Sequence, residues 1–463
     1  MYPNEPTHTE ELIQAIEENS PRITDILKAY IDEHDTTDML EGIKYYYKEN
    51  DITERIIYKY DNDGVKHPDY EATNNKLASG WHKLLVDQKT SYLVGDPVTI
   101  GSKTDQDIEV ILDTLGDEFD DTLPELVTAA SNKGVEWLHP YIDEEGNFDY
   151  IIIPAQEFIP IYDNTKRKNL INGIRVYELD DGTLKIELWD TEMVTFYEMV
   201  HGNIELDASI EVNPQSHWYK GENGFGWGKV PFVEFANNSK KVGDLTFYKD
   251  FIDAYDNLTS DTTNTLEDIQ EIFYVLRGYS GTDMDQAVTN LKRYKGAAVD
   301  AEGGIETVKA EVPVDSIEKF LDRIVGDIYQ FGQGVNTNTD KFGNSPSGIA
   351  LKFLFSLLDM KANVLERKFA KGLRQFMWFV CEYLGETNQG NFDHKDITFT
   401  FNKAMLMNEA EQVDMLMKSP ELSVRTKMEN HPMVTDAQVE MARREEENEG
   451  MIDLDNEEVE EDE

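Results

Sequence analysis

Cysteine is almost absent from this sequence of 463 residues, which contains Cys381 alone. A disulfide within one chain is therefore excluded, as expected for a protein made in a reducing compartment. Cys381 lies in the apolar run QFMWFVCEYL, so we expect a small buried residue there. The N-terminal MYPNEPTHTEEL lacks the basic and apolar regions of a signal peptide, and no stretch approaches the ~18 apolar residues of a membrane span, so we expect no membrane partner.

Positive charge is also scarce. The chain has 43 lysines and arginines against 92 aspartates and glutamates, which gives a net charge of -49. Affinity for DNA comes largely from neutralising phosphates with cations, so this charge argues against a tight, sequence-reading nucleic-acid binder. It is compatible with a protein that surrounds DNA without gripping it, because like charges along a channel wall repel each other.

Catalytic and metal-binding motifs are missing as well. The glycines of GVNTNTDKFG and GNSPSG are not followed by the Gly-Lys-Ser/Thr of a phosphate-binding loop, so we expect no ATP hydrolysis by this chain. The nine histidines are scattered without metal-ligand spacing. Residues 61–71 are similar to a calcium loop, but the spacing is wrong, and we predict a β-turn at residues 62–64 instead. We therefore predict no enzyme, no cofactor and no metal site.

The composition nevertheless predicts a folded core, because 40% of the residues are hydrophobic and 11% are aromatic. The length favours about three domains. Apolar periodicity predicts helices within residues 9–19, 20–35, 36–51 and 74–95. One antiparallel sheet is then predicted from short runs separated by turns such as DEEGN and DDG: VEWLHPYI, FDYIIIP, EFIPIYD, NGIRVYEL, GTLKIELWD and MVTFYEMV. The predicted fold class is α+β.

Long helices follow the sheet. Apolar spacing predicts helices over residues 244–277 and 313–332, the second capped by Asp315. The face that we expect the second helix to bury is Ile317, Phe320, Leu321, Ile324, Ile328 and Phe331. The polar stretch TSDTTNT (259–265) interrupts the first, so either two helices meet there or one helix carries a polar belt. Between the two, a short helix and a hairpin around Gly303 predict a small αβ insert that projects from one end of the helix pair.

Residues 336–353 (NTNTDKFGNSPSGIALKF) change character at Pro346. We predict a polar loop before it and a helix from Pro346 to about Leu384, capped by Asn344 or Ser345. The apolar stripe expected on this helix is Leu354, Leu358, Leu365, Phe369, Leu373, Phe376 and Val380. Polar loops of this length are uncommon unless they act on something or are disordered. A strand, DITFTF, and an acidic tail follow, with three short helices between them that are capped at Asn408, Ser423 and Thr435.

Two clusters of cations stand out against the acidic background. The first lies in the small insert and contains Lys292, Arg293 and Lys295. The second lies on the long helix after Pro346 and contains Lys361, Arg367, Lys368, Lys371 and Arg374. Either these residues form solvated faces that pair with acids of the same chain, or they meet an acidic partner, which would be DNA or a neighbouring copy.

Six segments, in this order, resemble the portal (head-to-tail connector) proteins of tailed bacteriophages, in particular the type of siphophages that infect Gram-positive hosts. They span nearly the whole chain and are YYYKENDI, NNKLASGWHKLLVDQKTSYLVGDPV, VPFVEFANN, DFIDAYDNLTSDTTN, SPSGIALKF and VRTKMENHPMVTDAQVEMARREEE. Each segment alone is a weak pattern, whereas six in the family's order are a specific one.

The resemblance implies a homo-oligomeric ring, a dodecamer, at one capsid vertex. Its channel would carry double-stranded DNA during packaging and exit, with contacts that do not depend on DNA sequence. The implied partners are the terminase large subunit, a head-completion adaptor, and the scaffolding and major capsid proteins. The protein would be assembled in the host cytoplasm and become part of the virion. The rival hypothesis is an acidic scaffold or adaptor of the virion that does not enclose DNA.

The resemblance also implies a division of the chain into parts. These are a wing (1–243), a stem helix (244–277), a clip (278–312), a second stem helix (313–332), a tunnel loop (333–345), a long wing helix with a strand (346–402) and a crown with an acidic tail (403–463). Lys292, Arg293 and Lys295 of the clip would dock terminase and adaptor. The loop residues that would line the DNA channel are Asn336, Thr337, Asn338, Thr339, Asp340, Lys341, Phe342 and Asn344.

Overall fold

The structure is a computed structural model that describes residues 8–17, 20, 22–104, 107–269, 273–277, 304–308, 313–336, 348–404, 409–429, 431, 433–434, 440–441 and 443–444. Its helices are α1 (His8–Glu17), α2 (Ile23–Glu33), α3 (Thr37–Tyr46), η1 (Asp51–Glu54), α4 (Trp81–Val94), α5 (Glu109–Leu115), α6 (Phe119–Lys133), η2 (Ala155–Glu157), η3 (Asp244–Phe247), α7 (Lys249–Ile269), α9 (Val314–Phe331), α10 (Gly348–Glu386), α11 (Glu409–Met417) and α12 (Val424–Glu429). Its strands are β1 (Tyr58–Tyr60), β2 (Lys66–Pro68), β3 (Thr99–Ser102), β4 (Val135–Ile142), β5 (Phe148–Ile153), β6 (Phe158–Tyr162), β7 (Leu170–Glu178), β8 (Leu184–Trp189), β9 (Met193–Val200), β10 (Asn203–Leu206), β11 (Gln215–Ser216), β12 (Trp218–Lys220), β13 (Asn223–Phe225), β14 (Val233–Ala236), β15 (Phe273–Arg277), β16 (Gly304–Val308) and β17 (Ile397–Thr400).

The predicted strands form two larger antiparallel sheets, not the single sheet that the sequence suggests. One sheet has the order β10-β9-β8-β7-β6, with β11 beside β9, and its neighbours are consecutive in the chain. The other has the order β14-β4-β5, and β14 comes from much later in the chain. Alternation predicts each strand but not its distant partner, which explains the error. The fold class, α+β, is confirmed.

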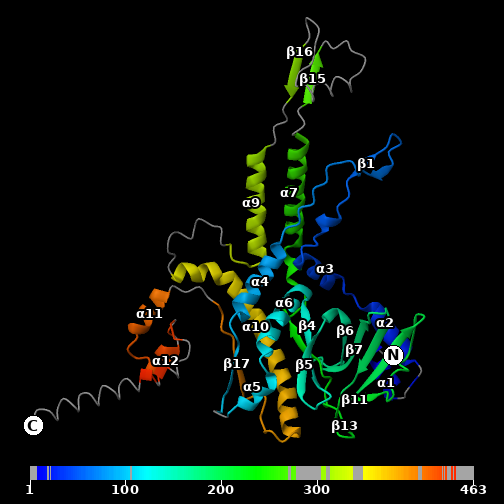
Figure 1. Cartoon of the computed structure of the whole chain (residues 1–463), viewed down its shortest axis with the longest axis vertical. Helices are drawn as coiled ribbons and strands as arrows, with labels where there is room; N and C mark the ends of the chain where they lie inside the picture. Colours follow the sequence, from blue (N-terminus) through cyan, green and yellow to red (C-terminus); the bar gives the residue numbers. More distant parts are fainter. Residues whose placement is uncertain are drawn as a thin grey trace, which may run out of the picture.

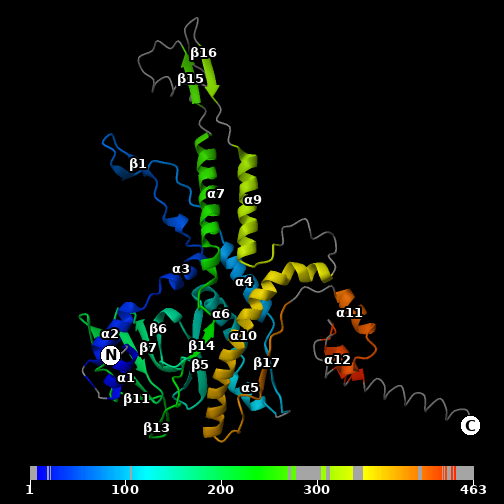
Figure 2. The same cartoon turned by 180° about the vertical axis from the view of Figure 1, so that it is seen from behind.

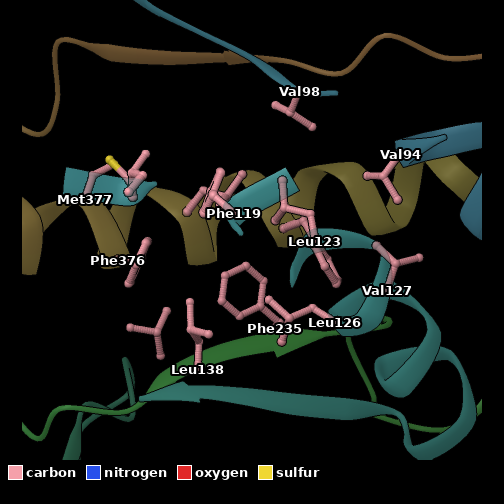
Figure 3. Packing of buried hydrophobic residues seen from close by; sticks show 14 of the residues in the cluster. Val94, Val98, Phe119, Leu123, Leu126, Val127, Leu138, Phe235, Phe376 and Met377 are labelled. Atoms are coloured by element: carbon pink, nitrogen blue, oxygen red, sulfur yellow. The ribbon is translucent and has the colours of Figure 1, made fainter. Parts of the chain in front are cut away.

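Each sheet is covered by its own helices. Leu12 of α1 and Leu27 of α2 pack against the β6–β10 sheet, where Ile174 and Ile186 are fully buried. α10 and α6 cover the β14-β4-β5 sheet, and Figure 3 shows Phe235 and Leu138 rising from that sheet toward α10. Between the two sheets, Phe158 stacks on Phe232 with 4.1 Å between ring centroids, so the sheets share one block of core.

α10 is the central helix of the largest core. The predicted apolar stripe is confirmed: its buried members are Leu358, Leu365, Phe369, Leu373, Phe376 and Val380. Leu354 is partly buried against the same core, and Cys381 is buried as predicted. The structure describes this helix from Gly348, so Pro346 and the proposed caps Asn344 and Ser345 lie outside the described residues.

Two of the C-terminal predictions can be checked. The strand after α10 is confirmed, because β17 pairs with β3 and Ile397 is buried. Ser423 caps α12 as predicted, since the backbone N–H of Thr426 donates to the Ser423 hydroxyl oxygen at 3.1 Å. Asn408 and Thr435 lie outside the described residues.

α7 and α9 lie side by side and form a stalk that stands clear of the two sheets, with β15 and β16 at its outer end (Figures 1 and 2). The predicted first helix is too long: α7 ends at Ile269, and Phe273–Arg277 form a strand that pairs with Gly304–Val308. FYVL favours a strand through its aromatic and β-branched residues, and periodicity cannot separate the two states in so short a run. The other arm of the hairpin predicted around Gly303 lies outside the described residues.

α9 differs from its prediction in two details. The helix begins at Val314, so Asp315 lies in the first turn and is not the cap. Proline at position 313 explains this start, because a residue without an N–H suits a helix entrance. Ile324 and Ile328 are buried as predicted, but Phe320 and Phe331 are 55% and 50% exposed, respectively. A single stalk therefore does not cover its own apolar residues.

The fourth predicted helix is also too long. α4 begins at Trp81, and residues 74–80 before it are not helical. Farther up the chain, the β-turn predicted at residues 62–64 is confirmed between β1 and β2. There the Asp61 carboxylate accepts the backbone N–H groups of Asp63 and Val65 at 2.9 and 2.8 Å, and Gly64 has a φ of 77° that suits glycine.

Candidate functional site

The segment that follows α9 is fixed against α4 by a pair of hydrogen bonds. The backbone N–H of Val335 donates to Gln88 Oε1 at 3.0 Å, and Gln88 Nε2 donates to the Val335 carbonyl at 2.9 Å. Gly332 and Gly334 lie so close to Leu85 that an added Cβ would come within 2.5 and 2.2 Å of its methyl groups. The last described residues before position 337 are therefore closely packed, and we call residues 332–335 the loop root.

Lys361 of α10 holds the same place from the other side. Its ammonium group donates to the carbonyl of Gly332 at 2.9 Å, where α9 has ended and a carbonyl needs a partner. The same group lies 2.9 Å from Asp244 Oδ2 in η3. One side chain thus joins α10, the end of α9 and the start of the α7 segment.

Asp244 is the centre of a buried charge cluster. Lys89 of α4 contacts Asp244 Oδ2 at 2.6 Å and donates to Asn237 Oδ1 at 2.9 Å. Asn237 Nδ2 in turn donates to Asp244 Oδ1 at 2.9 Å. Lys89 is fully buried and Asp244 is 3% exposed, so every polar atom here depends on its partners. Asp244, Asn237, Lys89 and Lys361 are called the charge cluster below.

The protonation of the cluster follows from its net charge. Burial alone would raise the pKa of Asp244, but the ammonium groups of Lys361 and Lys89 outweigh it and hold that pKa well below its usual range. Burial lowers the pKa of Lys89 to about 8, against the attraction of Asp244 and with the help of the repulsion from Lys361. Two cations share one anion and Lys89 has no access to water, so Lys89 loses its proton more easily than an exposed lysine does.

A buried histidine lies beside this cluster. His82 Nδ1 is 2.7 Å from the hydroxyl of Tyr248, whereas its Nε2 has no hydrogen-bond partner among the described residues. Burial lowers the pKa of His82 to about 4, so the ring is neutral at pH 7. It serves here as a polar packing residue between α4 and the foot of α7.

The polar belt of α7 has a definite partner, which decides between the two interpretations of TSDTTNT. α7 is one helix, and three of its side chains accept backbone N–H groups from the extended residues before α4. The bonds are Ser79 to Asp256 Oδ1 at 2.9 Å, Leu77 to Ser260 Oγ at 3.0 Å and Asn75 to Asn264 Oδ1 at 2.7 Å. We call Asp256, Ser260 and Asn264 the ladder.

The spacing of the ladder explains why the two segments fit. Four helical residues rise about 6 Å, and two extended residues rise about 6.6 Å. Ladder residues four positions apart on α7 therefore match backbone N–H groups two positions apart on the extended segment. The segment cannot pair with a sheet there, and the ladder satisfies its amides instead. Both partners belong to stretches named in the sequence comparison above, NNKLASGW and DFIDAYDNLTSDTTN. Their polar residues thus have a structural reason.

The sequence-predicted site residues fall into three groups. Asn336 is half-buried next to the loop root, and Thr337, Asn338, Thr339, Asp340, Lys341, Phe342 and Asn344 lie outside the described residues. Lys292, Arg293 and Lys295 lie outside them too. On α10, Lys361 points into the charge cluster, as in the interpretation of pairing within the chain, whereas Arg367, Lys371 and Arg374 are exposed and Lys368 is half-buried.

Sequence reasoning missed Gln88, Lys89 and Asp244. One signal could have found Lys89: it lies four residues from both Leu85 and Leu93, on the apolar stripe of a predicted helix. A lysine at such a position is almost never buried without a partner. Nothing in the sequence indicates that its partner is Asp244, which lies far along the chain.

Metal-ligand clusters and membrane-spanning helices are both absent from the part of the chain that the structure describes. No group of three or more His, Cys, Asp or Glu side chains converges there as metal ligands would. Among the helices described, none has both the length and the apolar character needed to cross a membrane.

The chain matches known proteins over almost its whole length. Residues 27–453 match the family described as "Phage portal protein, SPP1 Gp6-like". The portal protein of Bacillus phage SPP1 is 41% identical over 460 residues, which cover 96% of this chain and 92% of that protein. The portal protein of Clostridium phage phiCD119 is 32% identical over 428 residues, 87% of this chain and 90% of that protein. The chain therefore belongs to the SPP1 Gp6-like family of phage portal proteins.

Proposed function

We propose that this chain forms a ring at one vertex of the capsid, around a channel for double-stranded DNA. Family membership supports the general role, and one observation supports the ring. Phe320 and Val314 of α9 are 55% and 44% exposed, because the α7–α9 stalk stands clear of the sheets that could cover them. Stalks placed side by side in a closed ring would bury these residues and form a tubular wall.

The charge of the chain suits such a channel. At -49 per copy, a ring repels the phosphates of the DNA that it surrounds, so the duplex passes without being held. No phosphate-binding loop is present in the sequence, and in this proposal ATP hydrolysis belongs to the terminase. The chain would act as a conduit and not as an enzyme.

The parts of the chain take the following proposed roles. Residues 1–243 and 346–402 form the wing, α7 and α9 form the stem, and residues from 403 onward form the crown. Residues 278–312 form the clip, in which Lys292, Arg293 and Lys295 dock the terminase large subunit and the head-completion adaptor. Scaffolding and major capsid proteins are the further proposed partners in the virion, and twelve is the proposed number of copies.

Residues 333–345 are the proposed tunnel loop, which begins within the loop root. Its amides and hydroxyls would make short, neutral and reversible hydrogen bonds to the DNA backbone, with Lys341 as the cation near phosphate. The support for this proposal is the loop root. Gln88 and Lys361 fix residues 332–335, so a force on the loop would pass to α4 and α10. A contact on moving DNA needs such a fixed base.

The size and shape of the purified assembly test the ring. Mass measurement and negative-stain images should show closed rings with a central hole. Compact monomers or dimers would reject the ring and favour the acidic scaffold or adaptor that does not enclose DNA. This measurement needs no knowledge of the terminase or the host.

Deletion of Thr337–Lys341 tests the loop. We expect rings to form as in the wild type, because the root is unchanged, while heads fill with no DNA. A matched variant that replaces the same five residues with glycine and serine separates loop length from loop chemistry. Normal filling of heads by the deletion variant would contradict the proposed contact.

A further inference from the structure

α10 carries a second stripe on the side opposite its buried one. The positions alternate in steps of four and three residues, which is the heptad spacing of a helix that packs along a seam. All members are exposed in the single chain, and they are Phe353, Leu357, Met360, Val364, Arg367, Lys371 and Arg374. We call this stripe the outer seam of α10.

The apolar half of the outer seam has no cover. Phe353 is 76% exposed, Met360 is 59% exposed and Val364 is 48% exposed. In a helix that packs only on its own core, the face opposite the core is polar, as the rest of this helix shows. The turns from Phe353 to Val364 instead carry apolar residues on the outer face as well as on the buried one. A contiguous exposed apolar patch marks an interaction surface.

The basic half of the outer seam is unusual in its own way. Within the described residues, Arg367, Lys371 and Arg374 form no ion pair, although the chain has 92 acidic residues. By contrast, Lys361 of α10 binds Asp244 of its own chain. Lys403, which follows β17, binds Asp359 of α10. Three neighbouring cations without acids fit a surface that meets acids from outside.

The combination decides between DNA and protein as the partner. Phosphates would satisfy the three cations, but DNA offers nothing to cover Phe353 and Met360. A protein surface with an apolar centre and an acidic rim covers both halves, and this chain is itself strongly acidic at -49. In both views the first half of α10 extends beyond α9 and away from the two sheets, so neither sheet covers it (Figures 1 and 2).

We propose that the outer seam of α10 docks a second copy of this chain, and this rests on the ring proposed above. The contact is head-to-tail. Two parallel outer seams would set cations against cations, and two antiparallel seams would set cations against apolar residues, so the seam must meet a different, acidic surface of the neighbour. Such a heterologous contact is the kind that closes into a ring. It also places cations between copies whose net charges repel one another.

Charge reversal separates the alternatives. The test variant is Arg367→Glu, Lys371→Glu and Arg374→Glu, and the matched control is Lys166→Glu, Arg167→Glu and Lys240→Glu, which changes the net charge equally at exposed cations of the wing. Ring formation is followed by mass photometry over a concentration series, with urea unfolding to confirm the fold. We expect the test variant to need at least about tenfold more protein to form rings, and the control to behave almost as the wild type.

A second variant tests the apolar half. Leu357→Ser with Met360→Ser removes exposed apolar groups without touching the core, so rings should weaken while the urea midpoint stays unchanged. In a mixture of isotope-labelled and unlabelled subunits, carbodiimide should also join Lys371 to a carboxylate of another copy.

Three other outcomes would contradict the proposed role of the outer seam, and each has a different meaning. Wild-type ring formation by both seam variants would overturn it and leave the ring intact. Normal rings that fill with no DNA would assign the cations to DNA instead. A wild-type chain that forms no ring at all would overturn the ring and the seam together.

Discussion

Asp244 connects the stalk to α4 and α10, and its removal should be costly for a specific reason. Asp244→Asn leaves the ammonium groups of Lys89 and Lys361 buried without a counter-charge, which typically destabilises a fold by about 3–5 kcal/mol. Urea unfolding of the purified variant measures this. Asp250→Asn, at an exposed acid on α7, is the control and should change the free energy of unfolding by less than about 0.5 kcal/mol. Equal midpoints for the two variants would show that the charge cluster does not hold the fold.

Buried histidines should make the fold sensitive to acid. Burial lowers the pKa values of His82 to about 4, of His139 to about 3 and of His217 to about 4. Between about pH 6.5 and 5 the unfolded chain takes up protons at these rings, whereas the folded chain leaves them largely neutral. The free energy of unfolding therefore falls as the pH falls, by about 1.4 kcal/mol per pH unit for each histidine.

A variant can isolate one of these protons. His82→Gln should make the pH dependence of urea unfolding between pH 5 and 6.5 shallower by about one proton, whatever its effect on stability at pH 7. His201→Asn, which replaces an exposed ring at a turn, is the matched control. Parallel slopes for His82→Gln and wild type would mean that His82 also takes up its proton in the folded chain.

At the scale of elements, the ladder of α7 makes a helix dependent on an extended segment. Ser260 is fully buried, and Ser260→Ala leaves the part-buried N–H of Leu77 without an acceptor, which costs about 1 kcal/mol. Thr265→Ala, on the exposed side of the same helix, is the control. It should not destabilise the fold, because alanine is the better helix former. Hydrogen exchange at Leu77 gives the local readout, and it should accelerate only in Ser260→Ala. Unchanged exchange there would contradict the ladder.

Elements with strict periodicity were predictable, and those governed by distant partners were not. Seven apolar residues spaced three, four or seven apart place the buried face of α10, and a short apolar run, VEWLHPYI, marks β4 as a strand. Residues 74–80 were predicted as helix because NNKLASG contains no strong breaker before Gly80, yet three α7 side chains hold them extended. No local pattern could reveal that, since the ladder lies far along the chain.

The same division applies to the site. The polar loop, the basic stretch and the long helix after it could be found from residue types alone. The loop root could not, because Gln88 is an ordinary polar residue of α4 until the fold brings Val335 within 2.9 Å of it. Lys361 was grouped with Arg367 and Lys371 by sequence, but a helix turns them to different faces: Lys361 enters the charge cluster and the others remain exposed.

At the scale of the whole molecule, three blocks meet at one point. The sheets with α10, the stalk of α7 and α9, and the loop root all contact the charge cluster or its neighbours on α4. A force on the loop root or the stalk would therefore reach α4 and α10 through Lys361, Asp244 and Lys89. The position of this cluster is what makes the separate parts one mechanical unit.

Net charge should govern how copies of the molecule meet. At -49 each, copies repel one another over the Debye length, which falls from about 10 Å at 0.1 M salt to about 3 Å at 1 M. The apolar contacts proposed on α9 and α10 are not weakened by screening, so ring formation should strengthen as sodium chloride rises between these concentrations. Mass photometry at fixed protein concentration measures this, and a shift toward monomers at high salt would mean that ion pairs across the interface outweigh the repulsion between whole subunits.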